Sequence, residues 1–219
     1  MTQDNKNILL VEDHDSFRQA LALVFEQEPD FRVTAQADSL AEARTKLEGV
    51  DMVILDLGLP DGNGVDLIED LVSASPRVTT LVLSASLDRI QYGQALEAGA
   101  AGVLHKSASI KEIIGAARRL LAGETLLSQN EIVEMLRLVN RKREAERETQ
   151  IAIDKLTERE KDVLQALAEG LTSKEIATKL HITVETERTH MVNIFNKLSV
   201  HSRLQALVFA ARHGVVELR

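Results

Sequence analysis

The 219-residue chain contains no cysteine and no tryptophan, only three prolines, and just 3% aromatic residues. The lack of cysteine excludes disulfides and thiolate metal sites, which suits a reducing cytoplasm. No stretch approaches the ~18 consecutive apolar residues of a membrane span. The first residues also lack the basic and apolar regions of a signal peptide. We therefore expect a soluble, untargeted, cytoplasmic protein that has aliphatic cores and no membrane partner.

Basic residues are also scarce, because 26 Lys and Arg stand against 34 Asp and Glu. The imbalance lies at the front of the chain. Residues 1–125 carry 11 basic and 20 acidic residues, whereas residues 154–219 carry 10 and 9. A net charge of −8 would argue against nucleic-acid binding if the chain were taken whole. The nearly neutral charge of the C-terminal part is compatible with nucleic-acid binding but does not by itself indicate it.

Apolar runs alternate with segments of helical period before residue 125, which predicts a parallel sheet with helices on both faces. The expected strands are 7–12, 31–37, 51–56, 78–84 and 101–105. Apolar residues three or four apart mark the helices: Phe17, Leu21, Val24 and Phe25; Leu40, Ala43 and Leu47; Ile68, Leu71 and Val72; Ile110, Ile113, Ile114 and Ala117. The predicted fold class is α/β, a doubly wound (βα)5 array.

Two further regions follow. Residues 126–153 are predicted to form a helical linker, because an apolar stripe ends in the fully polar stretch NRKREAERETQ. Residues 154–219 are predicted to form an all-α domain of four short helices, with capping boxes in LTERE and LTSKE and N-caps at Thr183 and Ser202. The tight turn before Val184 indicates a helix-turn-helix. The expected domains are thus 1–125 and 154–219, joined by 126–153.

Five polar side chains fall at the carboxyl ends of the predicted strands, where ligands bind in open α/β sheets. They are Glu12, Asp13, Asp56, Ser84 and Lys106. Three carboxylates in one crevice repel one another unless a divalent cation lies among them, and hard oxygen ligands favour Mg²⁺. A metal, a lysine and a hydroxyl around one aspartate suit phosphoryl transfer to that carboxylate. We expect Asp56 to lie exposed in this crevice.

The stretches LLVEDHDSFR, VILDLGLPDGNG, LVLSAS and GVLHK resemble the signature stretches of bacterial receiver domains. The C-terminal LTEREKDVLQALAEGLTSKEIATKLHITVETERTHMVNIFNKLSVHSR resembles the LuxR-type helix-turn-helix. Together they resemble the NarL/FixJ subfamily of two-component response regulators, DNA-binding transcription regulators switched by phosphorylation. The partners implied are a sensor histidine kinase or a small phosphodonor, and double-stranded promoter DNA bound by a homodimer. The receiver assists its own phosphorylation and dephosphorylation and is otherwise not an enzyme.

The resemblance assigns a role to each site residue. It makes Asp56 the phosphoacceptor, with Glu12, Asp13, Asp56 and the backbone carbonyl of Gly58 holding Mg²⁺. Lys106 pairs with the phosphoryl group, and Ser84 moves to hydrogen-bond it. Family members usually carry an aromatic switch three residues before the lysine, where this chain has Val103. The histidines, including His14, are scattered rather than spaced as metal ligands.

In the C-terminal region the resemblance makes residues 183–198 the recognition helix. The helical period buries Val184, Met191, Ile194 and Leu198 and leaves a second set outside. The expected base-reading residues are Arg188, Thr189, Val192, Asn193 and Asn196, and the expected phosphate contacts are Lys174, Lys197 and Arg203. Leu204, Leu207, Val208 and Ala211 could form a dimer face or serve as plain core contacts.

Glu187 departs from the family pattern, which has a small aliphatic residue there. A glutamate in this stripe must be partly exposed, paired with Arg188 or Lys179, or destabilising. Beside Glu185 it also lowers the positive potential of a helix that approaches phosphates. We expect DNA binding that is weaker or more dependent on dimerisation than in the family at large.

Two other functions stay open on the sequence alone. One is a phosphohydrolase with Asp56 as covalent nucleophile, although haloacid-dehalogenase-like enzymes carry a second aspartate where this chain has Gly58. The other keeps the receiver and makes the C-terminal helices a protein-interaction module, as the near-neutral charge and Glu185 and Glu187 would suit.

Overall fold

The computed structural model describes residues 5–218. It contains two compact units, Met1–Asn140 and Arg141–Arg219, whose boundary falls within one long helix. The sequence had placed the boundary region at 126–153, and those limits remain a prediction. Among the described residues, no helix is long and apolar enough to cross a membrane. Each unit has its own buried core and is described separately below.

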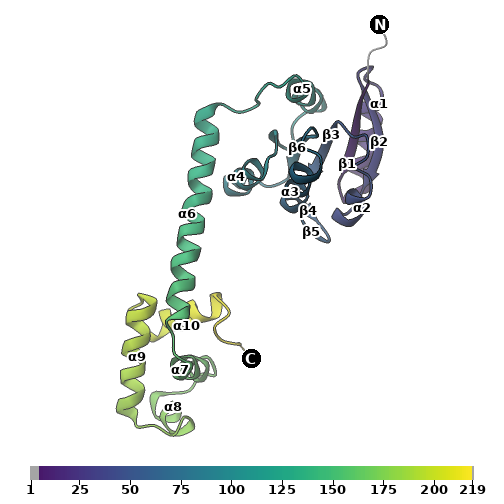
Figure 1. Ribbon diagram of the computed structural model, residues 1–219. Coiled ribbons are helices and arrows are strands. Elements are labelled where there is room, and N and C mark those ends of the chain that lie inside the picture. Colours follow the sequence, from purple (N-terminus) through teal and green to yellow (C-terminus); the bar gives the residue numbers. More distant parts are fainter. Residues whose placement is uncertain (1–4, 219) are drawn as a thin grey trace. The chain divides into compact units, whose positions relative to one another are not determined.

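The first unit is built on a five-stranded parallel sheet with the strand order β2-β1-β3-β6-β7 (Figure 1). The strands are β1 Lys6–Val11, β2 Phe31–Ala37, β3 Met52–Asp56, β6 Thr79–Ser84 and β7 Gly102–His105. Each begins and ends within one residue of the predicted range. The strand order reverses at β1, which lies between β2 and β3. The predicted doubly wound α/β fold is therefore confirmed.

Five helices cover the two faces of this sheet. They are α1 Asp15–Glu26, α2 Leu40–Arg44, α3 Gly64–Ala74, α4 Arg89–Ala98 and α5 Ile110–Leu121. Alternate residues of the central strands point to opposite faces. One core cluster joins one set of strand residues to α2, α3 and α4, and a second cluster joins the other set to α1 and α5. Strands buried on both faces explain the continuous apolar runs in the sequence.

A short hairpin follows β3 and shapes the loop after Asp56. It pairs β4 Gly58–Leu59 with β5 Gly62–Asn63. A Cβ atom on Gly64 would lie 2.6 Å from the carbonyl oxygen of Asp56 and 2.8 Å from Leu57 Cα. Only glycine fits this close approach. The loop is thereby folded back against the end of β3.

Helix α6, Gln129–Asp154, runs without interruption from the first unit into the second (Figure 1). Met135 and Val139 are buried near its start, and residues 140–148 are exposed. The expected packing at the start of the helix, followed by a solvated stretch, is confirmed.

The second unit adds α7 Glu158–Ala168, α8 Ser173–Lys179, α9 Val184–Leu198 and α10 Arg203–Arg212. Both predicted capping boxes and the caps at Thr183 and Ser202 are present. The four helices enclose a separate aliphatic core. The predicted four-helix domain is confirmed.

Candidate functional site

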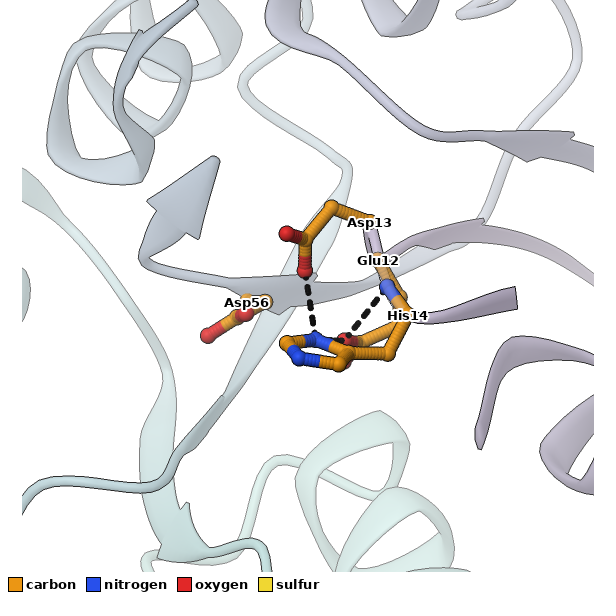
Figure 2. A group of neighbouring side chains, drawn as sticks. All are labelled: Glu12, Asp13, His14 and Asp56. Carbon is orange, nitrogen blue, oxygen red and sulfur yellow. Dashed lines mark hydrogen bonds and ion pairs between the residues drawn. The ribbon is translucent and has the colours of Figure 1, made fainter. Parts of the chain in front are cut away.

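Four of the five predicted strand-end residues meet at the carboxyl edge of the sheet. The Lys106 ammonium lies 2.7 Å from Asp56 Oδ2 and 2.7 Å from Glu12 Oε2. Carboxylate oxygens of Glu12, Asp13 and Asp56 lie within 4.8 Å of one another and of the His14 ring nitrogen. Figure 2 shows Asp13 and His14 beside Glu12, with Asp56 at the end of the neighbouring strand. The topology therefore gathers these groups as the sequence predicted.

Asp56 is buried, with 7% of its surface exposed, so the expectation of an exposed aspartate was wrong. Glu12 is buried as well, while Asp13 and His14 are exposed. Burial comes from the sheet, since Asp56 still pairs with Leu83 in the register of β3 and β6. Two buried carboxylates are tolerated because Lys106 neutralises charge between them.

The carboxylates at this edge of the sheet favour the protonated, charged forms of Lys106 and His14. Burial opposes the charge on Lys106, but hydrogen bonds to Asp56 and Glu12 outweigh it and raise the pKa of the ammonium above its ordinary value. A hydrogen bond to Glu12, aided by the charge of Asp13, raises the pKa of His14 above its ordinary value. One ammonium against three carboxylates leaves an excess of negative charge at this edge.

The donor set fits a hard divalent cation. Three carboxylates converge, and Asp13, the most exposed of them, leaves one side open to solvent. Mg²⁺ prefers one or two carboxylates and several waters, which an open site allows. Gly58 lies close to the acceptor, since a Cβ atom there would be 3.9 Å from Asp56 Oδ2. Its backbone oxygen as a further ligand remains a prediction.

Ser84, the fifth predicted residue, is buried at the end of β6. Its Oγ accepts a hydrogen bond of 3.1 Å from the amide of Ser86. Its carbonyl accepts from the Lys106 amide at 2.8 Å, but within residues 5–218 its hydroxyl forms no hydrogen bond with the side chain of Asp56 or Lys106. A turn toward the acceptor would therefore have to break the bond to Ser86.

His14 is the residue of the cluster that the sequence reasoning missed. Its Nδ1 lies 2.7 Å from Asp13 Oδ1 and 3.0 Å from Glu12 Oε1. Spacing between histidines gave no sign of this. The available signal was simply its position next to Glu12 and Asp13 at a strand end.

The second unit presents one exposed face of α9. All the predicted base-reading residues lie on it: Arg188, Thr189, Val192, Asn193 and Asn196. Met191, Ile194 and Leu198 are buried on the opposite face. Arg188 Nη1 lies 3.3 Å from Glu185 Oε2, an ion pair between two exposed side chains. Exposed ion pairs of this kind contribute little to stability, so Arg188 can readily leave Glu185 for another partner.

Two of the three expected phosphate contacts are already paired inside the unit. Lys197 Nζ lies 2.6 Å from Glu160 Oε2, and Arg203 Nη1 lies 2.7 Å from Glu187 Oε1. Lys174 is exposed at the start of α8. The structure thus leaves Lys174 more accessible than Lys197 and Arg203.

Glu187 is fully buried, with 0% of its surface exposed. The alternative of a partly exposed Glu187 was therefore wrong. Glu187 is paired, as a second alternative held, but with Arg203, because Arg188 and Lys179 pair with Glu185 and Glu169. Arg203 lies at the start of α10, and its guanidinium donates hydrogen bonds to Glu187 Oε1 and to Ser173 Oγ. Within the described residues, Glu187 Oε2 and Arg203 Nη2 lack hydrogen-bond partners.

Comparison with known proteins assigns both units. Residues 8–118 match the family described as the response regulator receiver domain, and residues 154–210 match the bacterial regulatory proteins of the luxR family. The chain belongs to the response regulators. It is a two-component response regulator with a LuxR-type DNA-binding domain.

Relatives match it over nearly the whole length. Response regulator protein VraR of Staphylococcus aureus is 29% identical over 212 residues, which cover 96% of this chain and 98% of VraR. The crystal structure of the response regulator ChrA of a heme-sensing two-component system is 28% identical, with a TM-score of 0.52 and coverage of 96% and 98%. An RcsB–DNA complex, 21% identical with a TM-score of 0.54 and coverage of 95% and 98%, shares the fold.

Proposed function

We propose that this regulator is switched by phosphorylation of Asp56, supplied by a sensor histidine kinase or a small phosphodonor. The observation that carries the proposal is the position of Lys106, whose ammonium bridges Asp56 and Glu12 at the carboxyl edge of the sheet. An aspartate held beside a cation and open to a divalent ion has the surroundings that a phosphoacceptor needs.

The chain's residues divide the chemistry between them. An Asp56 carboxylate oxygen attacks phosphorus and forms an acyl phosphate, while the bond from phosphorus to the donor's nitrogen or oxygen breaks and its electron pair leaves with the donor. Lys106 shifts from the carboxylate to a phosphoryl oxygen, and Ser84 turns to donate to another. Glu12, Asp13, Asp56 and the Gly58 carbonyl would hold Mg²⁺, whose charge would offset the negative charge of the transferring group. Hydrolysis of the acyl phosphate transfers the phosphoryl group to water and restores the Asp56 carboxylate. The receiver thus assists its own phosphorylation and dephosphorylation without acting on another substrate.

We infer that α9 reads DNA in the major groove. Arg188 suits bidentate contact with guanine, Thr189 and Val192 suit thymine methyl groups, and Asn193 or Asn196 suits adenine or phosphate. All five are exposed on one face of the helix. Lys174 suits a phosphate contact from α8, and Lys197 and Arg203 would join it after leaving Glu160 and Glu187. DNA as partner also implies a cytoplasmic protein.

The exposed apolar residues of α10 support a homodimer on DNA. Leu204 is 70% exposed and Val208 is 52% exposed, whereas Leu207 and Ala211 are half-buried. Ala206 and Ala210 are the buried core residues of this helix, and Phe209 and Ala211 also pack against the core. Leu204 and Val208 are therefore free to face a second copy, which would place two recognition helices on paired half-sites.

The direct test is transfer of labelled phosphoryl groups to the full chain from a small acyl phosphate in the presence of Mg²⁺. We expect one acid-stable but base-labile label per chain, lost in Asp56→Asn and retained in Asp61→Asn. Labelling of Asp56→Asn to the wild-type level would contradict the proposal.

A further inference from the structure

The loop that follows Ser84 is tied at both ends by side chains. Ser84 Oγ accepts from the Ser86 amide at 3.1 Å, and the Tyr92 hydroxyl donates to the Ser86 carbonyl at 2.6 Å. His105 Nε2 lies 3.1 Å from the Ala85 carbonyl oxygen. One residue of the loop, Ser86, is therefore bonded through its amide to the proposed phosphoryl sensor and through its carbonyl to helix α4.

Tyr92 sits on α4 and is half-buried against the core cluster that contains Val103. Burial raises the pKa of its phenol, so the hydroxyl stays protonated and able to donate at neutral pH. The valine on β7 has no polar atom with which to follow a change at Ser84. The phenol of Tyr92, on the same side of the sheet, has one.

The residue after Tyr92 joins α4 to the start of α6. A Cβ atom on Gly93 would lie 2.7 Å from Val139 Cγ2 and 2.8 Å from the Met135 carbonyl oxygen. The α6 backbone thus fits against a glycine notch on α4, with Met135 and Val139 buried around it. Arg89 Nη2 also pairs with Glu134 Oε2 at 3.0 Å. Close packing of this kind transmits small shifts, because neither helix can move into empty space.

We propose that Tyr92 is the positioning residue that passes the state of Ser84 to α4 and, through the Gly93 notch, to residues 132–139 of α6. The proposal rests on phosphorylation of Asp56. When Ser84 Oγ turns to the phosphoryl group, it gives up the Ser86 amide, and the loop at 84–86 is then held by His105 at the Ala85 carbonyl and by Tyr92 at the Ser86 carbonyl. Tyr92 follows the Ser86 carbonyl, and α4 shifts against α6. Because α6 continues into the second unit, its start is the place where the receiver can act on DNA binding.

Tyrosine fluorescence of the chain reports on Tyr92 alone, because the sequence has one tyrosine and no tryptophan. Tyrosine emission of the full chain is recorded while beryllofluoride, a mimic of the phosphoryl group, is added with Mg²⁺. We expect the emission to change in the wild type, to stay constant in Asp56→Asn, and to change much less in Ser84→Ala. Constant emission in wild-type protein that gains DNA affinity under the same conditions would overturn the proposal.

The second arm removes the hydroxyl alone. In Tyr92→Phe we expect the gain in DNA affinity on phosphorylation to fall about fivefold, as loss of one hydrogen bond of about 1 kcal/mol implies. Labelling of Asp56 should match the wild type, and the melting temperature should fall only by the few degrees that the loss of one hydrogen bond implies. Ser86→Ala is the matched control: it removes the hydrogen bond that Ser86 Oγ accepts from the Asp88 amide, keeps the amide and carbonyl that Ser84 and Tyr92 use, and should keep the gain.

Gly93→Ala tests the notch from the other side. The added methyl group displaces α6, so DNA affinity should become nearly the same with and without phosphodonor. A full gain in both Tyr92→Phe and Gly93→Ala would overturn this inference and leave the phosphorylation switch intact. Wild-type protein with no label on Asp56 would instead overturn the proposed function, and the inference with it.

Discussion

Lys106 Nζ lies 2.7 Å from Asp56 Oδ2 and 2.7 Å from Glu12 Oε2, so one ammonium holds buried carboxylates from two neighbouring strands. Removing it leaves those charges without compensation. We predict that Lys106→Ala lowers the free energy of unfolding of the first unit by about 3 kcal/mol. Mg²⁺ should restore part of the loss, because it binds the folded state alone. Denaturant titrations with Mg²⁺ or with chelator measure both effects, and an unchanged midpoint in chelator would count against the ion-pair account.

Asp13 is a proposed ligand of the metal, and within residues 5–218 it forms no ion pair with Lys106, which pairs with Glu12 and Asp56. Asp13→Asn should therefore weaken Mg²⁺ binding by roughly tenfold or more while leaving stability in chelator nearly unchanged, because it removes one charged ligand from an open site. Calorimetric titration with Mg²⁺ measures the affinity. Glu69→Gln, which removes an exposed carboxylate of α3, is the control and should bind Mg²⁺ as the wild type does. Equal affinity in both variants would exclude Asp13 as a ligand.

Glu187 and Arg203 should respond unequally to substitution. Glu187→Val replaces a buried charge by an apolar group of the kind a core accepts, so stability should change by less than about 2 kcal/mol. Arg203→Ala leaves Glu187 buried without its partner and should cost about 3 kcal/mol. Thermal unfolding of the two variants compares these costs directly, and equal destabilisation would contradict the pairing.

Glu187→Val should also strengthen DNA binding, because it removes a negative charge and releases Arg203 for a phosphate. The slope of log affinity against log salt should steepen by about one, as one added phosphate contact requires. Titrations of duplex DNA at several salt concentrations give both quantities. Unchanged or weaker binding would show that Arg203 does not reach the DNA.

Base reading and phosphate contact can be separated on the same helices. Arg188→Ala should cost about 1–3 kcal/mol on the preferred sequence and relax discrimination at one base pair. Lys174→Ala should weaken binding to all sequences alike and reduce the salt slope by about one. Affinities for a set of single-base variants of one site distinguish the two patterns.

Glu160 makes the second unit sensitive to acid. Burial opposes its charge, but the hydrogen bonds from Lys197 and from the amide and hydroxyl of Thr157 together outweigh burial and lower the pKa of the carboxyl below its ordinary value of 4.5. Because folding lowers this pKa, the ionised carboxyl stabilises the native state at pH values above the unfolded-state pKa. This stabilisation is lost as pH falls through the folded-state pKa. At pH values below about 4.5, the denaturant midpoint of unfolding should therefore decline more steeply with falling pH in the wild type than in Glu160→Gln. Parallel curves for the two proteins would contradict this contribution.

Strands and caps were predictable from the sequence because each depends on local pattern. Strands buried on both faces give continuous apolar runs, and a capping box needs only residues three apart. Helix α4 was not marked by an apolar stripe, since only Gly93 and Ala95 are buried on it. The hairpin of β4 and β5 is too short to show a period.

The site was predictable as far as topology determines it. Parallel strands bring their carboxyl ends to one edge, which placed Glu12, Asp56 and Lys106 together. Pairings across helices were not accessible, because nothing local connects Glu187 with Arg203 or Glu160 with Lys197. The burial of Asp56 was missed for a similar reason, since it depends on how neighbouring strands and the folded-back loop close over the acceptor.

The central claim is that phosphorylation of Asp56 controls DNA binding. The most direct measurement is selection of bound fragments from genomic DNA by the full chain, with and without a phosphodonor, alongside Asp56→Asn. The account predicts a defined set of sequences enriched by the wild type on addition of the donor, and no such increase for Asp56→Asn. Equal enrichment with and without donor, or the same increase in Asp56→Asn, would contradict it.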